Sequence, residues 1–126
     1  MQYKILANTL FLGKELLYLT ECHSTNDIAL EKIRAQEARE GLLVVTDYQS
    51  KGRGQRGNTW EGQPGLNLTF SLVVEPHFLP PHEQFKLNMA VSFAVMTVLN
   101  AFDPEIRIKW PNDIIHLKMG NSAVSL

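Results

Sequence analysis

The sequence has a single cysteine, Cys22, among its 126 residues, which excludes an internal disulfide and a multi-cysteine metal site. It also has no apolar run long enough to span a membrane, and its first ten residues lack the sustained apolar core of a signal peptide. These absences predict a soluble cytoplasmic protein without a membrane partner, in which Cys22 is a buried, inert thiol.

The sequence also lacks an excess of either charge, because 12 Lys and Arg residues against 13 Asp and Glu residues give a net charge of −1. A nucleic-acid-binding domain normally carries a clear basic excess, so we expect no nucleic acid partner. No helix-turn-helix segment precedes Leu16, which disfavours a transcriptional repressor. The length and the 44% hydrophobic content indicate one globular domain or part of one.

A glycine-rich basic loop at residues 48–60 stands out against this neutral background. Its three glycines (Gly52, Gly54 and Gly57) alternate with three cations (Lys51, Arg53 and Arg56), and no acidic residue occurs from Gln49 to Trp60. Glycine lets a backbone approach a ligand closely, and exposed N–H groups with arginine forks bind phosphate or carboxylate. The loop therefore predicts a site for a negatively charged small molecule, with Trp60 placed to cover or stack on a ring.

Two other interpretations of this loop have to be compared with the anion-site interpretation. Its spelling matches the dinucleotide fingerprint Gly-x-Gly-x-x-Gly, and the strand that the fingerprint needs is present at residues 42–46. The helix is not expected, because Gly62, Pro64 and Gly65 follow closely, and no Lys-Ser/Thr pair makes a Walker A loop. The remaining alternative is a basic, flexible surface hairpin.

Hydrophobic periodicity predicts an α+β fold in which a mixed, largely antiparallel sheet is packed with helices. The expected elements are a strand at 16–20, a helix at 25–39, strands at 42–49 and 66–74, a helix at 82–102, and strands at 105–110 and 114–117. Residues 118–126 carry little pattern.

Several local features sharpen this outline. Ser24 and Asp27 resemble a capping box at the start of the first helix, and Gly41 is placed to end it. Alternation puts Leu66, Leu68, Phe70 and Leu72 on one face of their strand, which we expect to be the core face. The second helix has apolar residues at helical spacing: Leu87, Val91, Ala94, Val95, Val98 and Phe102.

A second polar cluster, Lys109-Trp110-Pro111-Asn112-Asp113, lies where the strand at 105–110 ends. Lys109 is suited to neutralise a phosphate or carboxylate, Asn112 to donate to a phosphate oxygen, and Asp113 to hold Mg²⁺ or a ribose. The alternative is a proline turn capped by Asn112 and Asp113.

These motifs, together with His23-Ser24-Thr25-Asn26, resemble those of the biotin protein ligases, in the same order and with about the same spacing. The resemblance extends from Leu16 to about Leu117 and matches the single-domain type that lacks a DNA-binding domain. It implies a sheet related to the class II aminoacyl-tRNA synthetase fold. It also implies a reaction in which biotin and Mg-ATP form biotinyl-5′-AMP, which a lysine of a biotin carboxyl carrier protein then attacks.

The resemblance also implies roles for individual residues. Arg53 and Lys109 would be catalytic, and no residue is assigned as a metal ligand. The biotin-binding residues would be Ser24, Thr25, Asn26, Gln49, Gly52, Arg53 and Trp60. The ATP- and adenylate-binding residues would be Arg53, Gln55, Arg56, Trp60, Lys109, Asn112 and Asp113. The partner would be the carrier protein of acetyl-CoA carboxylase, and a homodimer is possible.

The sequence departs from the pattern of these ligases at two places. Gln55 stands where some members have arginine, and the Lys-(Leu/Val)-Ala-Gly-Ile and Gly-Ile-Gly-(Ile/Leu)-Asn stretches are missing after Asp113. Residues 1–126 are therefore expected to be the N-terminal part of a catalytic domain, cut short. Two alternatives stay open: a lipoate or octanoate protein transferase of the same superfamily, and a non-catalytic biotin-binding fragment.

Overall fold

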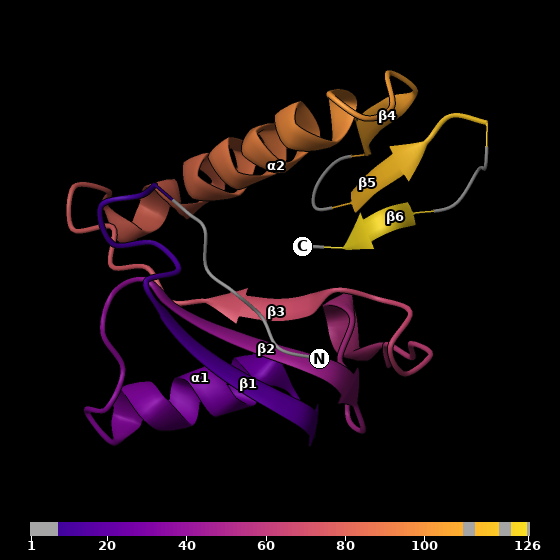
Figure 1. Cartoon of the computed structure of the whole chain (residues 1–126). Helices are drawn as coiled ribbons and strands as arrows, with labels where there is room; N and C mark the ends of the chain where they lie inside the picture. The colour runs from indigo at the N-terminus through magenta and orange to yellow at the C-terminus, as the bar shows by residue number, and fades with distance from the viewer. Residues whose placement is uncertain (1–7, 110–112, 119–121, 126) are drawn as a thin grey trace. The chain divides into compact units, whose positions relative to one another are not determined.

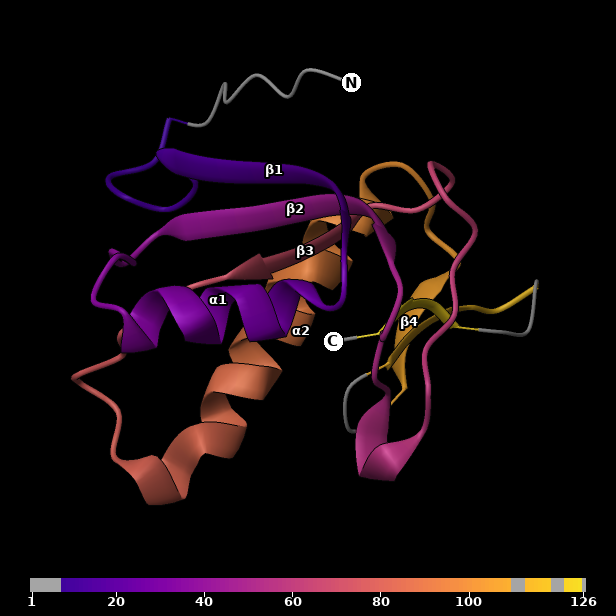
Figure 2. The same cartoon turned by 90° about the horizontal axis from the view of Figure 1, so that it is seen from below.

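The computed structural model describes residues 8–109, 113–118 and 122–125 of the chain. The chain divides into two units, Met1–Glu75 and Pro76–Leu126, each with helices and strands (Figures 1 and 2). This arrangement of elements confirms the α+β class with mixed strand directions. The described strands form two three-stranded sheets, one in each unit.

The first unit contains the strands β1 (Glu15–Cys22), β2 (Leu42–Gln49) and β3 (Thr69–Leu72), in that order in the sheet. β1 and β2 run parallel, with the helix α1 (Thr25–Arg34) between them in the chain, and β3 is antiparallel to β2. α1 covers one face of this sheet (Figure 2).

A small core lies between α1 and the sheet. Its buried residues are Ala29, Leu42, Val44 and Val73, with Leu17, Ile28 and Ala38 packed against them. Val44 is completely buried, and burial of a valine side chain contributes roughly 1.5–3 kcal/mol. This core packs α1 against the sheet that contains β1 and β2.

α1 is shorter than the sequence predicts and ends at Arg34, not near residue 39. Gln36 adopts a left-handed φ of 58°, and the N–H of Glu37 donates to the carbonyl of Lys32 at 2.9 Å. This is a Schellman ending with glutamine where glycine is usual. Gly41 therefore does not end the helix. It has φ +94° and lies so close to Phe11 that a Cβ would sit 2.1 Å from the carbonyl oxygen of that residue.

The capping-box prediction is half right. Ser24 is the N-cap residue of α1, but its side chain makes no capping hydrogen bond. The carboxylate of Asp27 forms an ion pair with Arg53 of the glycine-rich loop. The residue that would complete the capping box is thus engaged with the loop.

The face assignment of β3 was wrong. Leu66 and Leu68 are exposed and precede the strand, while Phe70 and Leu72 are 48% and 38% exposed. The opposite face of β3 carries Ser71, which contacts α1, and leads to the buried Val73. Alternation shows which residues share a face, whereas the helix decides which face is covered.

The second unit begins with a short 3₁₀ turn, Pro81–Glu83, followed by the helix α2 (Gln84–Asn100). The antiparallel strands β4 (Ile106–Lys109), β5 (Asp113–His116) and β6 (Ser122–Ser125) complete it (Figure 1). β6 lies in the stretch where no element was expected. Trp110, Pro111 and Asn112 lie outside the described residues.

The predicted apolar stripe of α2 is only partly buried. Leu87 and Val95 are half-buried, but Val91, Val98 and Phe102 are 42%, 61% and 85% exposed. The residue that is buried on α2 is Ser92. Within the described part of the chain, no helix is both long enough and apolar enough to cross a membrane.

Candidate functional site

The glycine-rich loop forms a hairpin that is closed by backbone hydrogen bonds. The N–H of Trp60 donates to the carbonyl of Gly52 at 2.8 Å, and the N–H of Gly54 donates to the carbonyl of Asn58 at 2.6 Å. At the tip, a 3₁₀ turn at Gln55–Gly57 places Arg56 at a φ of 56°. No helix opens within the loop, so the dinucleotide interpretation is wrong and the hairpin geometry is the one observed.

The base of this hairpin is tied to the end of β1. The N–H of Ser50 donates to the carbonyl of Cys22, and the N–H of Lys51 donates to that of His23, both at 2.9 Å. The hairpin therefore starts directly beside the residues that open α1. This register brings the first and second sequence motifs together in the first unit.

Gly52 is required by close packing at this junction. A Cβ at this position would lie 2.4 Å from the carbonyl oxygen of Trp60 and 3.2 Å from Nε2 of Gln49. A distance of 2.4 Å is far inside van der Waals contact, so any other residue would push the hairpin open. The absence of a side chain at Gly52 thus lets the hairpin backbone pass close to the amide of Gln49.

Neutral polar side chains from α1, β2 and β3 meet next to the hairpin. Oε1 of Gln49 accepts hydrogen bonds from the backbone N–H of Thr25 at 2.8 Å and from its hydroxyl at 3.1 Å. Oγ of Ser71 lies 2.8 Å from the hydroxyl oxygen of Thr25 and also contacts the amide of Asn26. Ser24 and Thr25 are 5% and 3% exposed. The structure thus brings Thr25, Asn26 and Gln49 together.

The sequence pattern does not single out Ser71 as a site residue. It lies on a strand far from the recognised motifs, and its alternation with Phe70 and Leu72 placed it on the face taken to be solvated. A hydroxyl on the polar face of a strand is an ordinary feature. Only the pairing of β3 with β2, which sets Ser71 opposite Val44, reveals its position.

The cations of the hairpin have different surroundings. Arg53 pairs with Asp27, and their side chains are 62% and 28% exposed. Arg56 at the tip is exposed, and Trp60 is 44% exposed. Gln55 belongs to the tip turn. A guanidinium that is largely exposed and held by one carboxylate can exchange that partner for an anionic ligand at modest cost.

Gln49 and Trp60 both line a small hollow beside the hairpin. It is lined by Asp47, Tyr48, Gln49, Trp60, Gly62, Gln63, Asn67 and Thr69. The carboxylate of Asp47 accepts a hydrogen bond from the hydroxyl of Tyr18 on the neighbouring strand. Except for Gln49 and Trp60, none of these lining residues was selected from the sequence as a ligand contact.

Cys22 is buried beside this region. Burial raises the pKa of its thiol, so the thiol stays protonated and weakly nucleophilic at neutral pH. The prediction of a buried, inert thiol is confirmed as far as burial and protonation state are concerned.

The second unit carries the remaining motif. Lys109 at the end of β4 and Asp113 at the start of β5 are register partners, so a cation and a carboxylate face each other across the hairpin. Asn112 lies outside the described residues. In the described part of the chain no three His, Cys, Asp or Glu side chains gather into a metal site. A single carboxylate such as that of Asp113 is compatible with Mg²⁺ binding, because Mg²⁺ is usually held by one or two carboxylates together with substrate phosphates.

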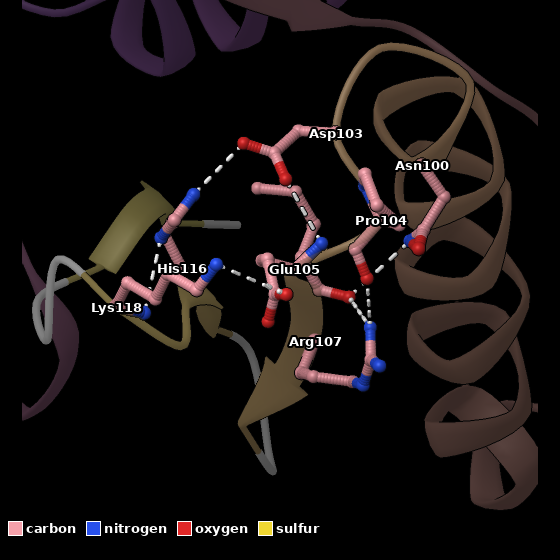
Figure 3. Close-up of polar contacts among 8 residues, drawn as sticks. Asn100, Asp103, Pro104, Glu105, Arg107, His116 and Lys118 are labelled. Carbon is pink, nitrogen blue, oxygen red and sulfur yellow. Dashed lines mark hydrogen bonds and ion pairs between the residues drawn. The ribbon is translucent and has the colours of Figure 1, made fainter.

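Polar contacts support the β4–β5 pair at the end opposite to Lys109 and Asp113 (Figure 3). Asp103 accepts from the backbone N–H of Glu105 at 2.9 Å and lies 2.8 Å from Nε2 of His116. Nδ1 of His116 accepts from the N–H of Lys118 at 3.2 Å, which assigns the proton of the neutral ring to Nε2. The Glu105 N–H and then the His116 ring hold the pKa of Asp103 below its usual value.

Together, the first unit presents a neutral polar cluster beside a cationic glycine hairpin. These are the features of a site for a small molecule with a neutral hydrogen-bonding part and an anionic part. The family comparison agrees: the model of the Biotin/lipoate A/B protein ligase family matches residues 18–122. The chain belongs to this family, which confirms the resemblance to biotin protein ligases.

Individual relatives support the same assignment. The Bifunctional ligase/repressor BirA of Bacillus subtilis strain 168 is 34% identical over 105 residues, which are 82% of this chain and 32% of the relative. The human Biotin--protein ligase is 32% identical over 123 residues, which are 90% of this chain and 17% of the relative. The chain thus spans about a third of the first of these relatives and less of the second.

Solved structures of biotin ligases are also similar to the chain. The biotin acetyl coenzyme A carboxylase synthetase of Helicobacter pylori with bound biotinylated ATP matches with a TM-score of 0.69 and 33% identity, covering 80% of this chain and 48% of that one. The biotin protein ligase of Aquifex aeolicus in complex with biotin and ATP has a TM-score of 0.65 and 30% identity, covering 80% and 41%.

Proposed function

We propose that the chain is the N-terminal part of a catalytic domain that attaches biotin to a lysine of a carrier protein through biotinyl-5′-AMP. The observation that carries this proposal is the joining of Thr25 and Gln49 to the Gly52–Trp60 hairpin within one unit. It is supported by the relatives, since solved biotin protein ligases hold biotin with ATP, or biotinyl-5-AMP.

In the proposed first step, a carboxylate oxygen of biotin attacks the α-phosphorus of ATP. The new O–P bond forms as the bond from the α-phosphorus to the bridging oxygen breaks, and pyrophosphate leaves with the electron pair. In the second step, the carrier lysine amine attacks the acyl carbon of the mixed anhydride, loses a proton, and expels AMP. Asp113 would hold Mg²⁺ bound to ATP, and the metal would supply neutralisation of the phosphate charge.

The residues have separate parts in this scheme. Ser24, Thr25, Asn26 and Gln49 offer neutral hydrogen bonds to the ureido ring of biotin. Gly52 and Arg53 hold the carboxylate and the phosphate, and Trp60 packs on the adenylate. Gln55 and Arg56 at the tip, with Lys109, Asn112 and Asp113, belong to the nucleotide end. Charge grows on the phosphate in both transition states, so fixed cations and N–H groups are the catalytic device.

In the structure Arg53 forms an ion pair with Asp27. Binding of the anionic part of the ligand requires the guanidinium to exchange this carboxylate for a ligand oxygen. The closed hairpin then excludes water, which protects the anhydride from hydrolysis. The proposal also includes a protein partner, a homodimer and a cytoplasmic location. The partner is the biotin carboxyl carrier protein of acetyl-CoA carboxylase.

The test is biotin-dependent exchange of labelled pyrophosphate into ATP, with lipoate as the control substrate. Exchange with biotin alone supports the proposal, and exchange with lipoate alone would assign the chain to lipoate chemistry. Biotin binding measured by calorimetry, without any exchange, would show a binding fragment without turnover.

A pair of lysine variants makes this test residue-specific. Lys109→Ala should lower the exchange rate by about 10²-fold, because a positioned cation on a developing charge has about this effect. Lys118→Ala is the matched control, because its side chain is 75% exposed and pairs with Glu105 at 3.5 Å. Equal rates for the two variants would remove Lys109 from the mechanism.

A further inference from the structure

The polar cluster of the first unit contains more oxygen contacts than it has hydroxyl protons. Three contacts join oxygen atoms in a row: Gln49 Oε1 to Thr25 Oγ1, Thr25 Oγ1 to Ser71 Oγ, and Ser71 Oγ to Asn26 Oδ1. Only the two hydroxyls of Thr25 and Ser71 supply hydrogen to these three contacts. One contact is therefore left without a proton. Two oxygen atoms within hydrogen-bonding distance repel each other when no hydrogen lies between them.

The amide of Gln49 cannot supply the missing proton. Its oxygen accepts from the backbone N–H of Thr25 at 2.8 Å, and a backbone N–H can only donate. The orientation of this amide is fixed by that bond, and its Nε2 is turned toward Gly52, 3.2 Å from where a Cβ on Gly52 would lie. Gln49 thus closes the row at one end as an acceptor.

Asn26 at the other end has no such constraint. The two ends of a carboxamide have nearly the same shape, and a rotation of 180° exchanges oxygen for nitrogen. With Nδ2 toward Ser71, each contact receives one proton: Asn26 donates to Ser71, Ser71 donates to Thr25, and Thr25 donates to Gln49. The direction of the whole row follows from the backbone N–H at its start.

We propose that Ser71 is a positioning residue that fixes the Asn26 amide with its nitrogen toward β3 and its oxygen outward, so that the polar cluster offers a donor from Gln49 and an acceptor from Asn26. This inference rests on the proposed function for its ligand, because a cyclic urea carries a carbonyl acceptor next to N–H donors. A ligand with a purely accepting or purely donating edge would leave one of the two amides unpaired.

The direction of the row is tested first in the ligand-free 126-residue chain. Nuclear magnetic resonance gives the exchange rate of the Asn26 side-chain amide protons with water. We expect one proton to exchange about fivefold more slowly than in Ser71→Ala, as for the loss of one neutral hydrogen bond, and Ser71→Thr to restore the slow rate. Asn100, whose Nδ2 donates to the carbonyl of Met96 at 3.1 Å, is the reference for a bonded amide.

Equal exchange in the wild type and in Ser71→Ala would overturn the proposed direction. This readout needs no ligand, so it stands even if the chain does not bind biotin, an outcome that would instead refute the proposed function. Unfolding temperatures of both variants show whether the fold is kept.

The ligand part is tested by calorimetry with biotin. Ser71→Ala should bind biotin about fivefold more weakly, because the freed Asn26 amide can turn and present the wrong group. Ser71→Thr, which keeps the hydroxyl, should bind within about twofold of the wild type. Unchanged binding in Ser71→Ala would overturn the role of Ser71 in ligand selection.

Discussion

The guanidinium of Arg53, in the glycine hairpin, forms an ion pair with the carboxylate of Asp27, in the first turn of α1. The pair joins two residues that are separated in the chain by the rest of α1 and the whole of β2. Because Arg53 is 62% exposed, the pair adds little to stability, and its main effect is to hold the guanidinium beside the first turn of α1.

Replacing Asp27 by Asn should free Arg53 for an anionic ligand. We expect the free energy of unfolding to change by less than about 1 kcal/mol, as for exposed ion pairs, and biotin to bind up to about fivefold more tightly at low salt. Calorimetry at two salt concentrations measures this, with Asp27→Glu as the charge-conserving control. Weaker binding in Asp27→Asn would show instead that the carboxylate orients Arg53 for its ligand.

The close approach at Gly52 gives a second prediction. In Gly52→Ala the new methyl group would meet the carbonyl of Trp60 and crowd the amide of Gln49. We expect biotin-dependent pyrophosphate exchange to fall by about 10²-fold, since a small misplacement of binding groups has this effect. Gly54→Ala is the comparison variant, because its Cβ would lie 3.3 Å from the Cβ and 3.4 Å from the carbonyl oxygen of Asn58, a much milder contact than the 2.4 Å at Gly52.

Gly41 should affect stability and not binding. Its φ of +94° and the 2.1 Å approach to Phe11 make alanine both strained and blocked. Gly65→Ala has a φ of +71° and nothing within 4 Å, so it should cost only about 1–2 kcal/mol for the left-handed backbone. Gly41→Ala should cost clearly more in urea unfolding. Equal losses would mean that the segment around Phe11 moves aside freely.

Asp103 gives a prediction about pH. Its pKa is held below the usual value of 3.8 in the folded chain, so its protonation must favour the unfolded state. Its contribution to stability is therefore fully present above about pH 4 and is lost as the pH falls through the lower folded pKa. Asp103→Asn keeps an acceptor for the N–H of Glu105 but cannot ionise. The stability gap between wild type and this variant should shrink below about pH 4, and a gap independent of pH would contradict this.

Much of this fold could be predicted from the sequence, because long segments with regular hydrophobic periodicity indicate whether they form a helix or a strand. The bounds of β2 were predicted without error, and the start of α1 at Thr25 followed from its N-cap residue. Its end did not, because Gln36 takes the left-handed conformation that glycine usually supplies and because Gly41 serves a contact with Phe11. β6 was missed, since four residues of the pattern Ser-Ala-Val-Ser carry no alternation that a turn could not also have.

The site was predictable where its residues lie in recognisable motifs and not where tertiary pairing brings them in. Thr25, Gln49 and Gly52 were selected from the sequence, and the structure places them in contact. Ser71 and Asp27 were not assigned to the site, because neither residue type nor spacing distinguishes them from ordinary strand and helix residues. Only the register of β3 and the position of the hairpin show what they touch.

The parallel pairing of β1 with β2 through α1 also has a consequence for how this part of the site assembles. The hydroxyls and amides of the polar cluster, together with the glycine hairpin, all lie between residues 24 and 71. A nascent chain that has emerged as far as Leu72 already contains each of these groups and the strands that hold them. In the proposed function, the groups that bind the neutral end of the ligand thus come from one short contiguous stretch of the chain.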